Sequence, residues 1–253
     1  GEETNTEPAK RCVINLSLGS NVGSHDGKDI LNQYFDAIMK QDNPIIVLSS
    51  GNEGDMNVAV KKKLSGTDLE AKSLIKGYDI PNDNGIGTAY YNLRYGGAHV
   101  WSDKAEPFDI KLVILNAERN KVAGLYSVDA NNRESGQYWV SSSSWQEDES
   151  DVIDNNILGK YFEGYIGLLG KLDEASGRYY YTIDFSLSDN HTNNSDQKYM
   201  IGILVTGKDG EQIDMYCNSA SMMTQFTNYS KYLDKTIDGW EPGSADGSIN
   251  SIA

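Results

Sequence analysis

The chain has 253 residues, 38% of them hydrophobic, and a formal net charge of −15. This length allows one large or two ordinary domains with a sizeable core. The negative charge argues against nucleic acid and anionic membrane surfaces as partners. No apolar run approaches the roughly 20 residues needed to cross a bilayer. The chain has two cysteines, Cys12 and Cys217, which do not make a disulfide framework. We expect two separate thiols, and a single bridge between them is the alternative.

The first structured stretch, residues 13–54, predicts a strand, a helix and a second strand. Residues 13–18 and residues 45–48 are short, β-branched apolar runs, which predicts strands buried on both faces. Between them, residues 30–39 carry apolar side chains at helical spacing, and Pro44 stops that helix. A strand–helix–strand unit of this kind implies parallel neighbours, whose ligands lie beyond the carboxyl ends of the strands. Residues 17–19 and 49–54 lie at that edge.

From residue 56 onward the pattern changes to short aromatic or β-branched runs separated by Gly, Asn, Asp and Ser clusters. This rhythm predicts an antiparallel β-sandwich or jelly roll. Residues 208–211 (Lys-Asp-Gly-Glu) predict a hairpin turn leading into a strand at 213–217. The predicted strands are residues 88–95, 99–102, 108–116, 122–128, 137–142, 161–169, 179–187 and 199–206.

Two blocks at the start of the chain, VINLSLGS at residues 13–20 and PIIVLSSGNEGD at residues 44–55, resemble the central part of subtilisin-like serine peptidases. The resemblance implies a partial α/β catalytic domain acting on a peptide or protein substrate, located outside the cytoplasm, at the cell surface or in the periplasm. It also implies that the Asn52 amide donates a hydrogen bond to the oxyanion. Residues Ser17, Leu18 and Gly19 would pair with the substrate backbone, and Ser49, Ser50 and Gly51 would form one wall of a specificity pocket.

The catalytic triad blocks of that family, D-[ST]-G, H-G-T-H and G-T-S-M-A, do not occur in the sequence. The histidines His25, His99 and His191 lie in loop or sandwich context, and residues 218–223 (NSASMM) lack the glycine-threonine lead of the serine block. We therefore expect this chain alone to be inactive. The uncapped end of the chain, at residues 248–253, suggests a fragment whose partner is the remainder of the catalytic domain. The expected division is residues 1–55 in a partial catalytic domain, 56–235 in an inserted β-sandwich that modulates substrate access, and 236–253 in a return segment.

The alternative function is a non-enzymatic module that binds carbohydrate or protein. Trp101, Trp139, Trp145 and the tyrosine runs at 90–91 and 179–181 could stack on sugars, but core packing and cross-strand pairing explain them more simply. No cofactor is expected. The acidic clusters at residues 147–154 and 189–196 offer oxygen ligands for Ca²⁺, although solvated acidic loops explain them better.

Overall fold

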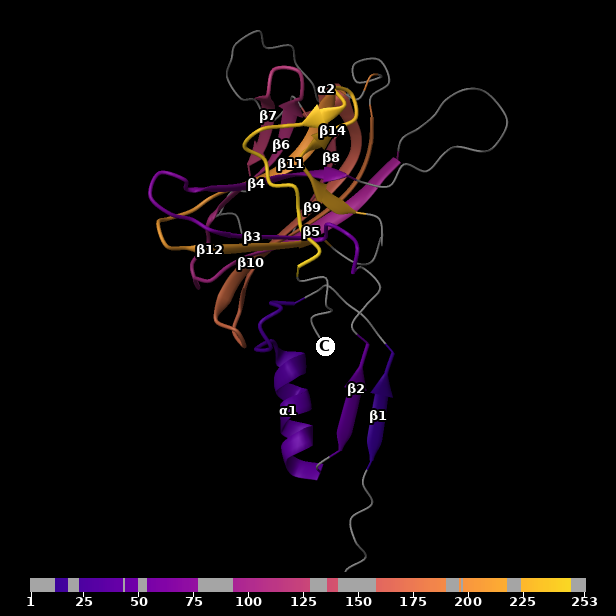
Figure 1. The fold of residues 1–253 in the computed structure, drawn as a ribbon, viewed down its shortest axis with the longest axis vertical. Coiled ribbons are helices and arrows are strands. Elements are labelled where there is room, and N and C mark those ends of the chain that lie inside the picture. Colours follow the sequence, from indigo (N-terminus) through magenta and orange to yellow (C-terminus); the bar gives the residue numbers. More distant parts are fainter. Residues whose placement is uncertain are drawn as a thin grey trace, which may run out of the picture.

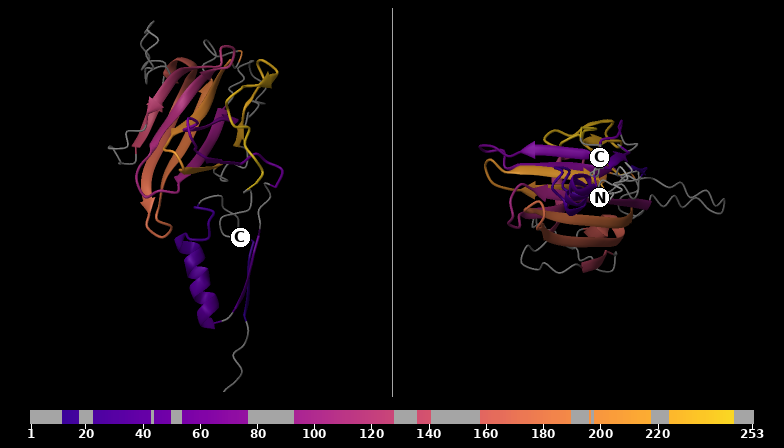
Figure 2. Two further views of the ribbon diagram at one scale, coloured as in Figure 1. Left: turned by 60° about the vertical axis from the view of Figure 1, so that its left-hand side comes forward. Right: turned by 90° about the horizontal axis from the view of Figure 1, so that it is seen from below.

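The computed structural model describes residues 12–17, 23–42, 44–49, 54–76, 93–127, 136–140, 158–189, 196, 198–217 and 224–246. These residues form a small α/β segment and a larger body made of two antiparallel β-sheets (Figure 1). The α/β segment extends from one end of the β-sandwich (Figure 2). The chain is thus mostly antiparallel β-structure, as the sequence predicted in outline.

The α/β segment consists of β1 (Val13–Leu16), α1 (Ile30–Asp42) and β2 (Ile45–Leu48). The two strands pair in parallel, with Val13 opposite Ile45 and Leu16 opposite Leu48. The Asp29 carboxylate caps α1, because its Oδ1 accepts hydrogen bonds from the backbone N–H groups of Leu31 and Asn32 at 3.0 Å. These elements occupy the stretches whose apolar patterns predicted them.

The prediction that both strands of this segment are buried on both faces is wrong. Side chains in β1 and β2 alternate between exposed and half-buried. Val13, Ile45 and Val47 are 63%, 57% and 47% exposed. Within the described residues, α1 is the only helix that lies along this strand pair (Figure 1). Apolar composition on both faces therefore does not mean burial on both faces in this chain.

The β-sandwich contains a six-stranded and a five-stranded open sheet. The six-stranded sheet has, in spatial order, β3 (Ala59–Lys63), β12 (Gln212–Cys217), β5 (Leu93–Ser102), β10 (Arg178–Asp189), β9 (Phe162–Asp173) and β8 (Gly136–Val140). The five-stranded sheet has β13 (Gln225–Thr227), β4 (Glu70–Lys76), β11 (Tyr199–Thr206), β6 (Asp109–Asn116) and β7 (Lys121–Ser127). The short helix α2 (Leu158–Tyr161) precedes β9, and β14 (Tyr229–Ser230) pairs with β15 (Lys235–Thr236).

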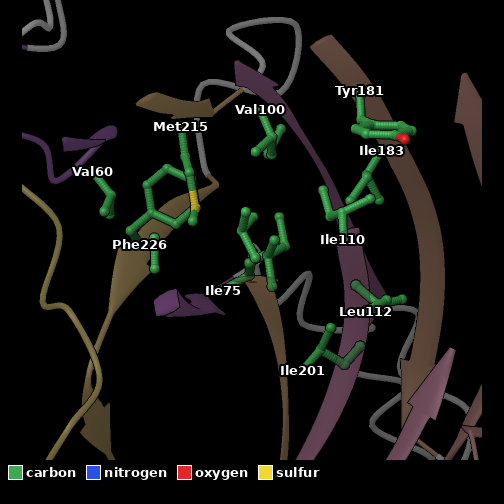
Figure 3. Close-up of a cluster of buried hydrophobic side chains, with 14 of the residues drawn as sticks. Val60, Ile75, Val100, Ile110, Leu112, Tyr181, Ile183, Ile201, Met215 and Phe226 are labelled. Atoms are coloured by element: carbon green, nitrogen blue, oxygen red, sulfur yellow. The ribbon is translucent and has the colours of Figure 1, made fainter. Parts of the chain in front are cut away.

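The main hydrophobic core lies between the two sheets (Figure 3). Val100, Ile183 and Met215 enter it from the six-stranded sheet, and Ile110 and Ile203 enter it from the five-stranded sheet. All five side chains are fully buried. Burial of this kind contributes about 25 cal/mol per Å² of apolar surface, so this core is the main source of stability in the described part of the chain.

A second, smaller core covers the outer face of the five-stranded sheet. Residues 228–241 cross this face, and Ile237 and Trp240 pack on Leu74, Val113 and Leu115. The Ser73 hydroxyl, fully buried in β4, donates to the Glu241 carbonyl at 2.7 Å. This segment, residues 228–241, is called the strap below. The predicted domain divisions at 55/56 and 235/236 stay predictions.

Most predicted strands coincide with observed ones, but two details differ. The turn at residues 208–211 forms, with Gly210 at φ 78°. However, it joins β11 to β12, which belong to different sheets, so it is not a hairpin turn. The sequence also did not predict β4. The strand predicted at residues 88–95 lies mostly outside the described residues, and a jelly-roll topology is not supported.

Candidate functional site

The carboxyl ends of β1 and β2 form the edge at which the sequence placed its candidate residues. Ser17 follows β1 and is exposed, and Ser49 follows β2 and is half-buried. The Ser49 N–H donates to the Leu16 carbonyl at 3.2 Å, so the parallel pairing continues past the end of β2. The two serines therefore lie at the same edge, which points toward the β-sandwich (Figure 1). Leu18, Gly19, Ser50, Gly51 and Asn52 lie outside the described residues, so their roles stay predictions.

An aromatic surface on the sandwich faces this α/β segment. Strand alternation directs Met215, Val100 and Tyr181 into the core. The opposite, outer face of the six-stranded sheet carries Tyr216, His99, Trp101 and Tyr180. Trp101 and Tyr180 are cross-strand partners and stack with ring centroids 4.4 Å apart.

This aromatic surface is covered rather than open. Trp101 is 3% exposed although it lies on the outer face, and the His25 ring stacks on Tyr216 at 3.9 Å between centroids. Tyr179 and Tyr181 are buried in the main core. The simpler interpretation, core packing and cross-strand pairing, therefore holds for these residues. Trp145 and the side chain of Trp139 lie outside the described part.

Burial shifts the protonation of two groups on this surface toward the neutral form. Burial lowers the pKa of His99 below its usual 6.5, and the Asp184 carboxylate only partly opposes this. Burial also raises the pKa of Tyr180, with a further contribution from Asp173. The aromatic surface therefore carries neutral side chains at neutral pH, which suits a packed contact.

Arg178, the first residue of β10, lies beside this surface and binds both parts of the molecule. Its Nε donates to the Ser102 carbonyl at 3.0 Å, and its Nη2 donates to Asp214 Oδ2 at 2.7 Å. Its Nη1 donates to the Ser24 carbonyl at 3.1 Å and lies 3.7 Å from Asp26 Oδ2. Ser102 and Asp214 belong to the sandwich, whereas Ser24 and Asp26 belong to the loop before α1. Sequence reasoning missed this cluster, because Arg178 stands 154 positions from Ser24.

The described residues contain no group of three or more His, Cys, Asp or Glu side chains that could hold a metal ion. The acidic cluster at 147–154 lies outside the described part, as do most residues of 189–196. Cys12 and Cys217 are both free thiols, and burial raises the pKa of Cys217. Among the described helices, none is long and apolar enough to cross a membrane.

The other chemical candidates from the sequence are partly placed by the structure. His25 lies in the loop before α1 and His99 in β5. His191 and residues 218–223 lie outside the described part of the chain. The described residues at the carboxyl edge thus provide backbone groups and two serine side chains, Ser17 and Ser49.

The fold and this edge together define a β-rich protein with a short α/β segment. A chain with this fold is the CspB protease of Clostridium perfringens, which superimposes with a TM-score of 0.51 at 17% sequence identity. The match covers 86% of this chain and 37% of the protease chain. No family model matches the sequence, and no curated protein matches it.

These comparisons correct the family assignment. The prediction that the chain belongs to the subtilisin-like serine peptidases is wrong, because no family model or curated relative supports it and the likeness that was found is distant. At 17% identity, the likeness shows the fold alone. Both blocks are rich in β-branched apolar residues, which a buried parallel strand of any family needs, so they do not identify a family by themselves. The expected location outside the cytoplasm depended on that assignment and stays a prediction.

Proposed function

We propose that this chain is part of a peptidase, in which the α/β segment supplies a peptide-binding edge and the β-sandwich modulates access to it. The observation that carries the proposal is the structural likeness to a protease over 86% of this chain, which includes the large β-rich part. Because the chain spans 37% of that protease, the catalytic groups are expected in polypeptide beyond this chain.

The exposed apolar residues of the α/β segment support the need for further polypeptide. Val13, Ile45 and Val47 lie exposed on the strand pair, and Ile30 and Tyr34 lie exposed on α1. Adjoining exposed apolar side chains usually mark a surface that another structure covers. A partner that adds parallel strands beside β1 or β2 and a layer over Val47 would complete this sheet.

The residues after the two strands have a specific role in this proposal. Ser17, Leu18 and Gly19 would pair with the backbone of an extended substrate, and Ser49, Ser50 and Gly51 would line the adjacent pocket. Asn52 would donate its side-chain amide to the oxyanion that forms on the scissile carbonyl. A neutral donor aimed at developing charge stabilises the transition state more than the substrate.

Two measurements on the full-length protein test the proposal. We expect Asn52→Ala to lower kcat by about 10²–10³ on a fluorogenic peptide, the range typical of losing one oxyanion donor. The matched control is Asn32→Ala, which changes the same residue type in α1. Deletion of residues 56–241, which removes the sandwich together with its strap, should change cleavage of a folded protein much more than cleavage of a short peptide. No peptidase activity in the full-length protein, or equal effects of the deletion on both substrates, would overturn the proposal.

The carbohydrate-binding alternative receives no support from the described aromatic residues. Trp101 is covered, and Tyr179 and Tyr181 point into the core. A glycan array with this chain would favour the alternative only if binding were specific and were lost on substitution of a tryptophan.

A further inference from the structure

The loop between β1 and α1 is seated on the outer face of the six-stranded sheet. Its described part, residues 23–29, contains His25, which stacks on Tyr216 with ring planes 14° apart. Ser24 is buried although it lies in a polar loop. The carbonyl of Ser24 accepts a hydrogen bond from Arg178. Residues 23–29 are called the seated loop below.

The Arg178 side chain connects that loop to the sandwich through hydrogen bonds. Its side chain is only 10% exposed, and its three donor nitrogens are each engaged. Two of these bonds anchor the guanidinium to the sandwich, at Ser102 and Asp214, and the third reaches the loop at Ser24. A guanidinium offers its donors in one rigid plane, so fixing two of them fixes the direction of the third. Hydrogen bonds with an ionised donor are also stronger than neutral ones.

The backbone conformation of the seated loop places Ser24 and Asp26 beside this arginine. His25 and Gly27 adopt left-handed backbone conformations, with φ of 53° and 72°. The Asp26 carboxylate accepts from the Ser24 hydroxyl and from the Lys28 N–H, which leaves its Oδ2 3.7 Å from Arg178. A left-handed non-glycine residue costs of order 1 kcal/mol or more, so surrounding contacts must hold it in place.

The contact continues from the loop into α1. Asp29 caps the helix, and Gln33, the fourth residue of the helix, donates its Nε2 to the Ala175 carbonyl at 3.2 Å. Ala175 lies in the turn between β9 and β10, three residues before Arg178. The same end of the β9–β10 pair therefore touches both the loop and the beginning of the helix.

We propose that Arg178 is a positioning residue that latches the seated loop to the β-sandwich, so that the sandwich sets the position of the loop that leaves the carboxyl end of β1. The latch couples the two parts of the molecule at one point. Its consequence for substrate access rests on the proposed function, because the carboxyl end of β1 is the proposed peptide-binding edge. The latch itself is defined by contacts within this chain.

Hydrogen exchange on the intact chain tests the latch without any need for peptidase activity. Local opening of a segment raises the exchange of its amides, whereas global unfolding raises exchange everywhere. In Arg178→Met we expect exchange of amides 23–33 to rise about ten-fold, the effect of losing charge-assisted hydrogen bonds. Exchange in β6 and β11 should rise by a smaller factor, because the substitution also leaves Asp214 in the sandwich without its partner. Arg178→Lys keeps the charge but not the planar fork, and should give a smaller rise in the same segment.

Two further variants separate a latch from a merely structural arginine. Arg119→Met removes an exposed arginine in the β6–β7 turn and should leave amides 23–33 unchanged. Asp26→Asn weakens the loop side of the cluster and should raise exchange at 23–33 while the melting temperature of the sandwich stays constant. Unchanged exchange at 23–33 in Arg178→Met, or an equal rise at every amide, would overturn the latch and leave the proposed function standing. Absence of peptidase activity would overturn the proposed function and leave the latch standing.

Discussion

The α/β segment and the β-sandwich use similar apolar residues but bury them to different extents. In the sandwich, alternate residues of β6 and β11 are fully buried between the two sheets. In the α/β segment, the isoleucines and valines of β1 and β2 are half-buried or exposed. The two sheets of the sandwich cover each other and enclose a core. The strand pair of the α/β segment has α1 on one face, and its other face is exposed.

The contrast shows that the apolar pattern of a strand and its burial in this chain can differ. β1 and β2 have the near-continuous apolar pattern of strands with both faces covered. In this chain only one cover is present among the described residues. Under the proposed function, the difference between pattern and burial marks where further polypeptide would pack. Substitutions that compare the two regions test the difference itself.

The largest expected effect is in the sandwich core. Ile203 in β11 is fully buried between the sheets, so Ile203→Ala should reduce the free energy of unfolding by about 2–5 kcal/mol. Val47→Ala removes an apolar side chain from the open face of β2, and should cost less than about 1 kcal/mol in this chain. The four tryptophans all follow residue 100, so urea unfolding followed by tryptophan fluorescence reports on the sandwich. A comparable loss in both variants would contradict the contrast.

The next effect concerns the strap over the outer face of the five-stranded sheet. A Cβ at Gly202 would lie 2.9 Å from the Ser73 carbonyl oxygen and 2.9 Å from the Trp240 ring. We expect Gly202→Ala to cost about 1–3 kcal/mol, because the backbone or the strap must move. Thermal unfolding followed by tryptophan fluorescence measures this.

Gly167 in β9 is the matched control for Gly202. A Cβ there would meet its nearest atoms at 3.8 Å and 3.9 Å, which is ordinary contact. Gly167→Ala should therefore leave the melting temperature unchanged or raise it slightly. Equal destabilisation by both substitutions would show that the strap does not limit the space at Gly202.

Local patterns in the sequence predicted much of the strand structure but not the pairing. The short aromatic and β-branched runs at residues 199–206 and 108–116 predicted β11 and β6. The sequence did not predict β4, whose Lys72 and Ser73 look unsuited to a buried strand. Lys72 extends over the Trp240 ring at 5.7 Å, and the Ser73 hydroxyl bonds to Glu241. Both partners come from the strap, which no local pattern around β4 reveals.

The site was harder to predict than the fold. The two strand ends, Ser17 and Ser49, follow from the parallel pair and could be placed from sequence. The Arg178 cluster could not be, because its partners are 36 and 154 positions away and none forms a motif with it. The one local signal was the unusual loop at residues 23–27, where two glycines flank Ser24, His25 and Asp26.

The aromatic surface between the two regions should make stability depend on pH. The pKa of His99 is lowered in the folded state. As the pH falls, His99 is therefore protonated more readily in the unfolded chain than in the folded chain. The contribution of His99 to the free energy of unfolding is therefore complete above about pH 6.5. Below that value the free energy of unfolding falls by up to about 1.4 kcal/mol per pH unit. We expect the difference in unfolding free energy between pH 7.5 and pH 5.5 to shrink in His99→Gln, measured by urea titration. The same pH dependence in both proteins would contradict this role.

The smallest expected effect is confined to the α/β segment. Asp29→Ala removes the cap of α1 and should cost about 1 kcal/mol of helix stability. Because the core of the sandwich does not involve this helix, we expect faster exchange of the amides at residues 30–33 with no change in tryptophan-detected unfolding. Asp36→Ala makes the same chemical change at an exposed position in the middle of α1 and should leave those amides protected. If uncapping α1 also lowered the free energy of unfolding of the sandwich, the two regions would unfold as one cooperative unit. The exposed apolar face of β1 and β2 would then belong to a complete fold and would not indicate a missing partner.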